Sequence, residues 1–537
     1  MQLNVPNNGF MKNKGERMPI ERGSKIKSLT EVDVLVIGGG ATGLGIAVDS
    51  VTRGYKTLLL EKNDYAKATS SRSTKILHGG VRYLAQGNIS LVKEALAEKM
   101  RLYENAPHVA RSMNFIVPST NTLSKMYYRI GMLAYDALAG FRKKYLSKGQ
   151  NHQEMIATLK NIKYMYLRGG VLYNDGQFDD ARTAIALLRT LEDHGGTALN
   201  YAEVISFIKE KEKIVGAVFL DKVSGEKISV RAKCVFNATG IYADNLMDLD
   251  ATNHQPMVNL AQGIHLVVNR HLYPNKSAML VPKTTDGRVL FFIPWYNKVI
   301  IGTTDVHVEK VQDDPAPLKE EINLIIKNAN LYLDEPLTKE DVSSVYAGIR
   351  PLMQMPQNKT STAKISREDH IDISSSGLIT IVGGKWTTYR HMGEKVINFA
   401  IAHNKLENRL CKTRNLRLHG YVNAIDAKEI PFNYRFYGSE YETIKKIPGF
   451  HKVLHDDLPI CEAQILYAIQ HEQALTLDDV LARRTRCLFL NAKATLSIAE
   501  KVASIMQIAL KQTEQWKTQQ IKDFNTIAKK YLISSYI

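Results

Sequence analysis

Three glycines near the start of the sequence have the spacing of a nucleotide-binding turn. Gly38, Gly40 and Gly43 fit the pattern G-x-G-x-x-G directly after an apolar run. In this pattern the first glycine allows a tight turn, the second lets the backbone approach a pyrophosphate, and the third lets a helix pack against a strand. Glu61 ends the next apolar run, where a carboxylate can bind ribose hydroxyls. The spacing therefore predicts a dinucleotide-binding turn.

Two later strand ends favour FAD over NAD as that dinucleotide. One buried run ends at Ala238 and Gly240, and another ends at Gly383 and leads into a helix start over 384–388. The positive end of a helix can stabilise the negative charge that a flavin ring gains on reduction. A dehydrogenase that uses only NAD has no need of this distant second helix.

The hydrophobic pattern predicts the elements that position these residues. Apolar runs over 32–37 and 55–60 flank a helix over 43–53, which makes a βαβ unit. From about residue 411 the pattern is mostly helical. Further helices are predicted over 91–105 and 179–194, buried or half-buried strands over 201–208, 233–237 and 378–382, and antiparallel strands over 263–269, 289–293 and 299–302.

The segment ATSSRSTKILHGGVRYL at 68–84 strongly resembles the FAD-dependent glycerol-3-phosphate dehydrogenases, which belong to the amine- and amino-acid-oxidase-like superfamily of flavoproteins. The resemblance covers about 31–500. One departure is Ile241-Tyr242, where the family usually has Pro-Trp. The other segments that carry it stand in the same order along the chain: 179–182, 237–240, 263–265, 293–295, 302–305, 348–352, 366–368 and 383–390.

The resemblance implies an α/β fold with three parts. A Rossmann-type FAD-binding domain carries an inserted antiparallel-sheet substrate domain, and a mostly helical domain follows. We expect a flexible basic tail over 1–30, the oxidoreductase domain over 31–405 and the helical domain over 411–537. Within the oxidoreductase domain, we expect FAD-binding segments at about 31–110, 180–260 and 345–405, and substrate segments at about 111–179 and 261–344.

The implied reaction oxidises sn-glycerol 3-phosphate to dihydroxyacetone phosphate and passes electrons to a membrane quinone. Hydride moves from C2 of the substrate to N5 of FAD, and the protein supplies binding groups and a base. Planar cations suit the phosphate. The substrate-binding candidates are Arg82, Tyr83, Arg350, Arg367 and Lys385; the cofactor-binding candidates are Gly38, Gly40, Gly43, Glu61, Thr69, Ser70, Ser71, Thr74, Lys75, Val204, Ala238, Gly240, Asp305, Gly384, Trp386, Thr387 and Thr388.

Three residues compete for the role of base. His78 precedes two glycines beside the flavin loop, and we favour it, since a neutral imidazole titrates near working pH. His265 lies in a predicted strand, so the alternative is that it only packs in the core and has no catalytic role. Lys385 could also serve if burial lowers its pKa. The residues alone leave the choice open.

The positive charge of the chain points to an acidic partner. Lysine and arginine exceed aspartate and glutamate by 17, and residues 1–150 carry +12 of that excess. Residues 121–150 hold six basic residues and one aspartate, with Met126, Ile130, Leu133, Ala137 and Phe141 at helical spacing. Such a basic amphipathic segment with aromatic neighbours suits a membrane interface, although a core-packed helix is the alternative. We therefore expect a peripheral enzyme on the cytoplasmic side of the plasma membrane.

Other functions fit the sequence less well. A glycerol-3-phosphate oxidase that uses oxygen is one alternative, but such oxidases usually carry a long insertion that this chain lacks. An amine or amino-acid oxidase of the same fold is another. A nucleic-acid-modifying flavoprotein would need aromatic stacking platforms, which are not evident. The four cysteines are too scattered for a metal site, so we expect no metal. A homodimer is the commonest oligomer and is our expectation.

Overall fold

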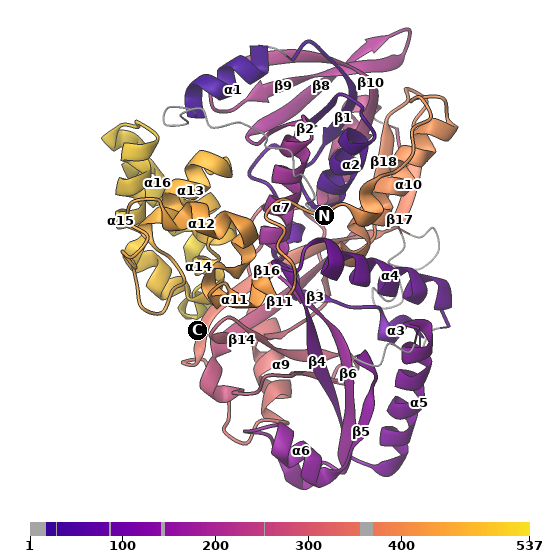
Figure 1. Ribbon diagram of the computed structural model, residues 1–537, viewed down its shortest axis with the longest axis vertical. Helices are drawn as coiled ribbons and strands as arrows, with labels where there is room; N and C mark the ends of the chain where they lie inside the picture. Colours follow the sequence, from indigo (N-terminus) through magenta and orange to yellow (C-terminus); the bar gives the residue numbers. More distant parts are fainter. Residues whose placement is uncertain are drawn as a thin grey trace, which may run out of the picture.

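The computed structural model describes residues 18–27, 29–84, 87–140, 145–251, 253–354 and 369–536, without the side chains of 18–21, Lys27, Arg82 and Tyr83. Two large sheets form the body of the molecule, one above the other in Figure 1, and the C-terminal helices lie beside them. No helix that the structure describes qualifies as a membrane-spanning segment. This α/β architecture confirms the predicted fold class.

The first sheet contains the predicted βαβ unit. Strand β1 (Glu31–Ile37) pairs in parallel with β2 (Thr57–Leu60), and helix α2 (Ala41–Thr52) connects them. On its other side β1 pairs in parallel with β10 (Lys227–Asn237). The carboxyl ends of β1 and β10 therefore meet at one edge. The remaining strands of this sheet are β7 (Thr197–Leu199), β8 (Ala202–Glu210), β9 (Lys213–Asp221), β17 (Asp369–Ile373) and β18 (Ile379–Gly383).

The second sheet is almost entirely antiparallel. Its centre is β11 (Val258–Asn269), which pairs with β14 (Lys298–Gly302) and with β16 (Val342–Met353). Residues 345–353, expected among the FAD-binding segments, thus pair within this sheet. The other strands are β3 (Ile76–Leu77), β4 (Ala110–Ser119), β5 (Lys148–Gln150), β6 (Gly169–Phe178), β12 (Ala278–Val281), β13 (Leu290–Trp295) and β15 (Val306–His307).

Helix α2 packs closely on helix α10 (Tyr389–Ala402), because glycines remove the side chains between them. A Cβ atom on Gly45 would lie 2.6 Å from the carbonyl oxygen of Tyr389, and one on Gly393 would lie 2.5 Å from that of Gly45. The other helices are α1 (Met18–Lys27), α3 (Val81–Leu84), α4 (Ile89–Asn105), α5 (Thr122–Leu138), α6 (His152–Thr158), α7 (Asp180–Asp193), α8 (Ala243–Asp250), α9 (Lys319–Asn330), α11 (Asp426–Glu429), α12 (Tyr441–Lys445), α13 (Glu462–His471), α14 (Cys487–Leu490), α15 (Ala492–Ala509) and α16 (Glu514–Lys529).

A buried ion network ties the C-terminal region to the loop after β2 and to α7. Arg484 donates to both carboxylate oxygens of Asp64, at 2.6 and 2.8 Å, and Arg182 pairs with Glu472. Burial alone would raise the pKa of Asp64, but Arg484 and Arg483 overcome this and lower it. Because each charge has a partner, the region is fixed against the loop that follows β2. The domain boundary that we expect near residues 405–411 stays a prediction.

The expectation of a flexible tail over 1–30 is wrong for residues 18–27. Residues 18–27 form α1, and Ile26 is buried. The Arg22 guanidinium donates to Asp221 at 2.6 Å and to the carbonyl oxygen of Asn200 at 2.6 Å. These contacts hold the helix on the first sheet, which the polar composition of the segment did not indicate. Residues 1–17 lie outside the described part of the chain.

Candidate active site

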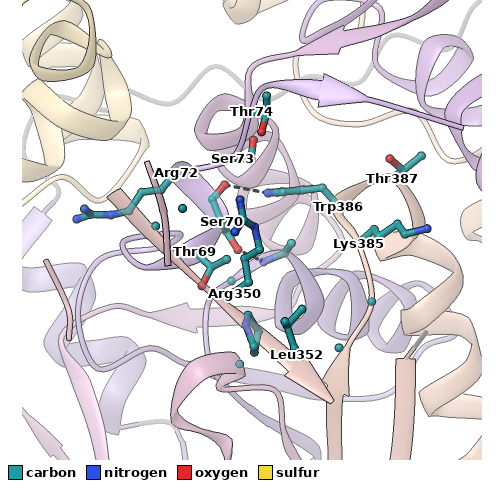
Figure 2. A pocket seen from close by; sticks show the side chains of 18 of the residues that line it. Thr69, Ser70, Arg72, Ser73, Thr74, Arg350, Leu352, Lys385, Trp386 and Thr387 are labelled. Atoms are coloured by element: carbon teal, nitrogen blue, oxygen red, sulfur yellow. Dashed lines mark hydrogen bonds between the residues drawn. The ribbon is translucent and has the colours of Figure 1, made fainter. Parts of the chain in front are cut away.

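A cavity of about 1300 Å³ lies where the two sheets meet. It exceeds the roughly 300–1000 Å³ of an ordinary small-molecule pocket. The β1–α2 turn, the loop after β2 and the segment before α10 line one part of it. Strands β11 and β16 line another part, and Figure 2 shows Arg350, Lys385 and the 69–74 loop around it. The cavity is thus large enough for a dinucleotide with a substrate beside it.

The glycine turn has the geometry of a pyrophosphate site. Gly38 has a φ of +110°, which other residues rarely adopt. A Cβ atom on Gly43 would lie 1.8 Å from the carbonyl oxygen of Gly38, so α2 could not approach β1 with any side chain there. The N-cap residue of α2 is Gly40, which has no side chain to cap the first turn, and the amide of Ala41 donates to Ser70 Oγ at 3.0 Å. Gly38 and Gly40 line the cavity, whereas Gly43 acts by close packing.

Glu61 stands at the end of β2, as predicted for a ribose-binding carboxylate. Its Oε2 accepts from the amide of Gly39 at 2.7 Å, and its Oε1 accepts from the amide of Asn63 at 2.8 Å. Burial raises the pKa of Glu61 and outweighs these hydrogen bonds. Each carboxylate oxygen keeps a lone pair for a ribose hydroxyl. Val204, Ala238 and Gly240 also line the cavity.

The segment before α10 forms another wall of the cavity. Gly384 has a φ of +78°, and Lys385, Trp386 and Thr387 line the cavity. The Trp386 indole donates to the carbonyl oxygen of Ser70 at 2.8 Å, which joins this wall to the 69–74 loop (Figure 2). Thr388 does not line the cavity; it is buried, and its hydroxyl donates to the carbonyl oxygen of Lys385.

The loop over 69–75 is divided between the cavity and the core. Thr69, Ser70 and Thr74 line the cavity, but Ser71 and Lys75 do not. Lys75 has a φ of +62°, and its fully buried ammonium donates to Asp180 at 2.6 Å and to the carbonyl oxygen of Ser71 at 2.7 Å. Burial lowers the pKa of Lys75 to about 7, against the opposing effect of Asp180. Both residues therefore support the loop from behind.

His265 lies on β11 with its ring fixed on two sides. Its Nε2 is 2.9 Å from Thr74 Oγ1, and its ring stacks on Tyr346 at 4.8 Å between ring centroids. Nδ1 is buried and has no hydrogen-bond partner in the described structure. Burial, then the charges of Arg350 and Lys75, lower the pKa of His265 well below its ordinary value. The imidazole is therefore neutral near pH 7.

Arg350 brings the main positive charge to the same region. It donates to Thr303 Oγ1 at 2.9 Å and to the carbonyl oxygen of Thr304 at 3.2 Å, and it pairs with Asp305 at 3.3 Å. Its guanidinium lies over Gly263, where a Cβ atom would come within 2.3 Å. Asp305 lines the cavity and also holds Arg350 in place.

The remaining predicted residues divide into two groups. His78 and Lys385 line the cavity together with His265 and Arg350. The side chains of Arg82 and Tyr83, and all of Arg367, lie outside the described residues. The structure thus brings two histidines and two cations to one cavity, and it does not test the other three candidates.

Sequence reasoning missed residues that act through the predicted ones. Tyr346 carries the ring on which His265 stacks, and its hydroxyl donates to the carbonyl oxygen of Ser73 at 3.0 Å. Arg72 is buried beside the cavity and donates to the carbonyl oxygen of Ala347. Arg72 stands within the 68–84 motif, which was a usable signal. Tyr346 stands alone in an apolar strand, so its position in the sequence gave no such signal.

Comparisons with known proteins agree with this geometry. Residues 33–390 match the family described as FAD dependent oxidoreductase, and 378–519 match the C-terminal domain of alpha-glycerophosphate oxidase. A probable mitochondrial glycerol-3-phosphate dehydrogenase of Dictyostelium discoideum is 35% identical over 93% of this chain and 84% of that protein. The chain belongs to the family of FAD-dependent glycerol-3-phosphate dehydrogenases. Its cofactor is FAD, as predicted.

Two further relatives support this membership. The mitochondrial glycerol-3-phosphate dehydrogenase of Homo sapiens is 36% identical over 93% of this chain and 73% of that protein. The structure of the glycerol-3-phosphate dehydrogenase from Bacillus halodurans complexed with FAD matches with a TM-score of 0.77 and 29% identity. That match covers 95% of this chain and 98% of the other. The likeness extends over both sheets and the C-terminal helices.

Proposed function

We propose that the chain oxidises sn-glycerol 3-phosphate to dihydroxyacetone phosphate and delivers the electrons to a membrane quinone. Bound FAD supplies the acceptor for the hydride that leaves C2 of the substrate. The observation that carries the proposal is the pairing of a fixed arginine, Arg350, with a neutral histidine, His265, in the cavity that holds the dinucleotide turn. The names of the relatives agree with this substrate.

Arg350 and Lys385 bind the substrate phosphate in this proposal. A guanidinium presents paired donors that match phosphate oxygens, and an ammonium adds a second charge. Thr303 and Asp305 hold Arg350 in a fixed position, so little conformational freedom is lost when the dianion binds. Arg82, Tyr83 and Arg367 remain candidates for the same anion.

His265 takes the proton from the C2 hydroxyl in this proposal. Only three atoms separate the substrate phosphorus from that hydroxyl oxygen. A phosphate bound to Arg350 therefore keeps the hydroxyl near His265, whose pKa Arg350 helps to lower. Thr74 and Tyr346 fix the ring, which a base needs if it is to meet one substrate atom. His78 also lines the cavity and is the competing base.

An anaerobic flavin titration tests the reaction. Glycerol 3-phosphate should bleach the flavin absorbance of the purified holoenzyme, whereas glycine and sarcosine should leave it unchanged. A short-chain quinone added next should restore the oxidised spectrum faster than oxygen does. Bleaching by an amine and not by glycerol 3-phosphate would make the chain an amine oxidase. Faster recovery with oxygen would make it an oxidase.

Helix α5 supports the membrane part of the proposal. Leu123, Met126 and Ile130 are 82%, 61% and 57% exposed, and Lys125 and Arg129 lie on the same helix. Figure 1 shows α5 on the side of the lower sheet, away from the C-terminal helices. The predicted apolar face is therefore open and not packed in the core. Phe141 and the basic residues 142–144 lie outside the described part.

The cavity also reaches this helix. Tyr128, Ile130 and Met132 line it from α5, and Leu280 and Phe291 line it from the second sheet. An apolar route of this kind would let a quinone approach from a membrane without crossing water. Lys and Arg near an anionic surface add at most about 1 kcal/mol each, so the apolar side chains must supply the rest.

Sedimentation with anionic vesicles tests the membrane face. Burying one isoleucine stabilises binding by roughly 1.5–3 kcal/mol, so I130D should weaken vesicle binding at least tenfold. The matched control is I508D, because Ile508 on α15 is also exposed, at 79%. Equal losses in the two variants would show that α5 has no special role.

A further inference from the structure

A second, smaller cavity lies between the oxidoreductase part and the C-terminal region. It measures about 60 Å³, room for roughly four or five water-sized groups. A phosphate ion has five heavy atoms. Residues 107–111 and 177–179 line one side, with Trp295 and Tyr296. Phe432, Arg435 and Phe436 of the C-terminal region line the other. Phe178 is shared with the walls of the large cavity.

Two arginines line this cavity without an acidic partner in the described structure. Arg111 donates through Nε and Nη2 to the neutral amide oxygen of Gln177, at 3.2 and 2.7 Å. Arg435 makes one long hydrogen bond, 3.4 Å, to the carbonyl oxygen of Lys428, and its buried Nε has no partner in the described residues. Each guanidinium has five N–H donors, and the described protein groups accept from two donors of Arg111 and one of Arg435.

The other groups around the cavity do not neutralise this charge. Asp179 is the acid in the lining, but it accepts from the amide of Arg182 and lies 3.5 Å from Arg486. Burial lowers the pKa of His108 to about 3, so its imidazole is neutral at pH 7. The ring of Phe432 lies 5.0 Å from the Arg111 guanidinium and 5.7 Å from that of Arg435. Two like charges thus share one aromatic side chain.

We propose that this cavity is a second anion site, which takes a phosphate-sized dianion between Arg111 and Arg435. Half-buried cations of the same sign repel each other and lose hydration, and an anion between them attracts both and accepts hydrogen bonds from both. Water could fill the space but would not offset the charge. The site is separate from Arg350 and does not depend on the proposed substrate.

Equilibrium dialysis of the FAD-loaded full chain against radioactive inorganic phosphate tests the site. The wild type should bind two phosphates, one in each cavity. R435Q and R111Q should each weaken one of the two by at least tenfold, with unchanged FAD content and a KM for glycerol 3-phosphate within twofold. The matched control is R417Q, because Arg417 is exposed, contacts Tyr421 at 4.4 Å and lies outside the cavity.

Two outcomes would overturn the site: R435Q and R111Q keep both phosphates, or R417Q loses as much binding as they do. A crystal of wild-type holoenzyme soaked in selenate gives a measurement that needs no variant. An anomalous peak between the two guanidinium groups supports the site, and a peak in the large cavity alone refutes it. Repeating the dialysis with glycerol 2-phosphate as competitor distinguishes a monoester ligand, which displaces phosphate more strongly, from the free ion.

Discussion

Replacement of His265 by glutamine should remove the base and leave the substrate site standing. The side chain is 2% exposed, and the stack on Tyr346 and the hydrogen bond to Thr74 fix its position. Glutamine can keep a hydrogen bond to Thr74 but cannot accept the proton. A positioned general base contributes about 10²–10⁴-fold to a rate, so we expect flavin reduction to slow about 10³-fold, which is roughly 4 kcal/mol.

Anaerobic stopped-flow measurement of flavin absorbance checks this rate. H265Q should keep its FAD and bind substrate with a dissociation constant within a few-fold of the wild type, because Arg350 and Lys385 are untouched. H78Q is the comparison variant, and it should slow flavin reduction far less. The reasoning is refuted if H265Q reduces its flavin at the wild-type rate while H78Q loses about three orders of magnitude.

The pH dependence offers a second test of the same residue. Only the neutral imidazole can accept a proton, and burial, Arg350 and Lys75 lower the pKa of His265 well below its usual value. The profile of kcat/KM reports groups of the free enzyme. As the pH falls from 8 through about 6.5, the ordinary pKa of histidine, it should therefore show no loss of activity beyond that from protonation of the substrate phosphate, whose second pKa is about 6. A limb at that pH that H78Q removes would assign the base to His78.

Four other substitutions test the parts around this base. R350K keeps the charge but loses the paired donors, so KM for glycerol 3-phosphate should rise about 10- to 100-fold in steady-state assays, the equivalent of roughly 1.5–3 kcal/mol. G263A should raise KM similarly with normal FAD content, because its Cβ would meet the Arg350 guanidinium at 2.3 Å. G43A should instead lose bound FAD, measured as flavin absorbance per protein, since its Cβ would lie 1.8 Å from the carbonyl oxygen of Gly38. Burial alone would raise the pKa of Glu394, but Arg390 and a second arginine overcome this and lower it to about 2. Its stabilisation, about 1–2 kcal/mol after screening by water, is complete above pH ~4.5 and lost as the pH falls toward 2. Acid-unfolding curves of E394Q should therefore converge with those of the wild type at low pH.

The sequence could predict the dinucleotide end of the site because that chemistry is local. The turn at Gly38–Gly43 and the carboxylate of Glu61 belong to one βαβ unit, whose period and glycines are visible in a short window. The docking of α1 could not be predicted in this way. Arg22 finds its partner in Asp221, about 200 residues along the chain, so no local pattern records the contact.

The choice between His78 and His265 was open for the same reason. The environment of His265 comes from Tyr346 and Arg350 on β16, and only the pairing of β16 with β11 brings them together. For α5, the sequence indicated the helix and its apolar face but not whether that face is exposed. Its helical period was readable, but whether another element covers that face depends on the tertiary structure, which leaves Met126 and Ile130 exposed.

The register of β11 against β16 determines how the base and the phosphate clamp meet. His265 stands opposite Tyr346, Gly263 opposite Gly348, and Ala261 opposite Arg350. Residues directly opposite each other project to the same face of an antiparallel pair, and so do alternate residues along each strand. His265 and Arg350 therefore share one face, with two glycines between them.

Those two glycines leave the space that the arginines use. A Cβ at 263 would meet the guanidinium of Arg350, and a Cβ at 348 would lie 2.9 Å from the Cβ of Arg72. A slip of one residue in the register would turn His265 and its neighbours to the opposite face. The eleven paired positions of these strands thus bring base and clamp to one cavity.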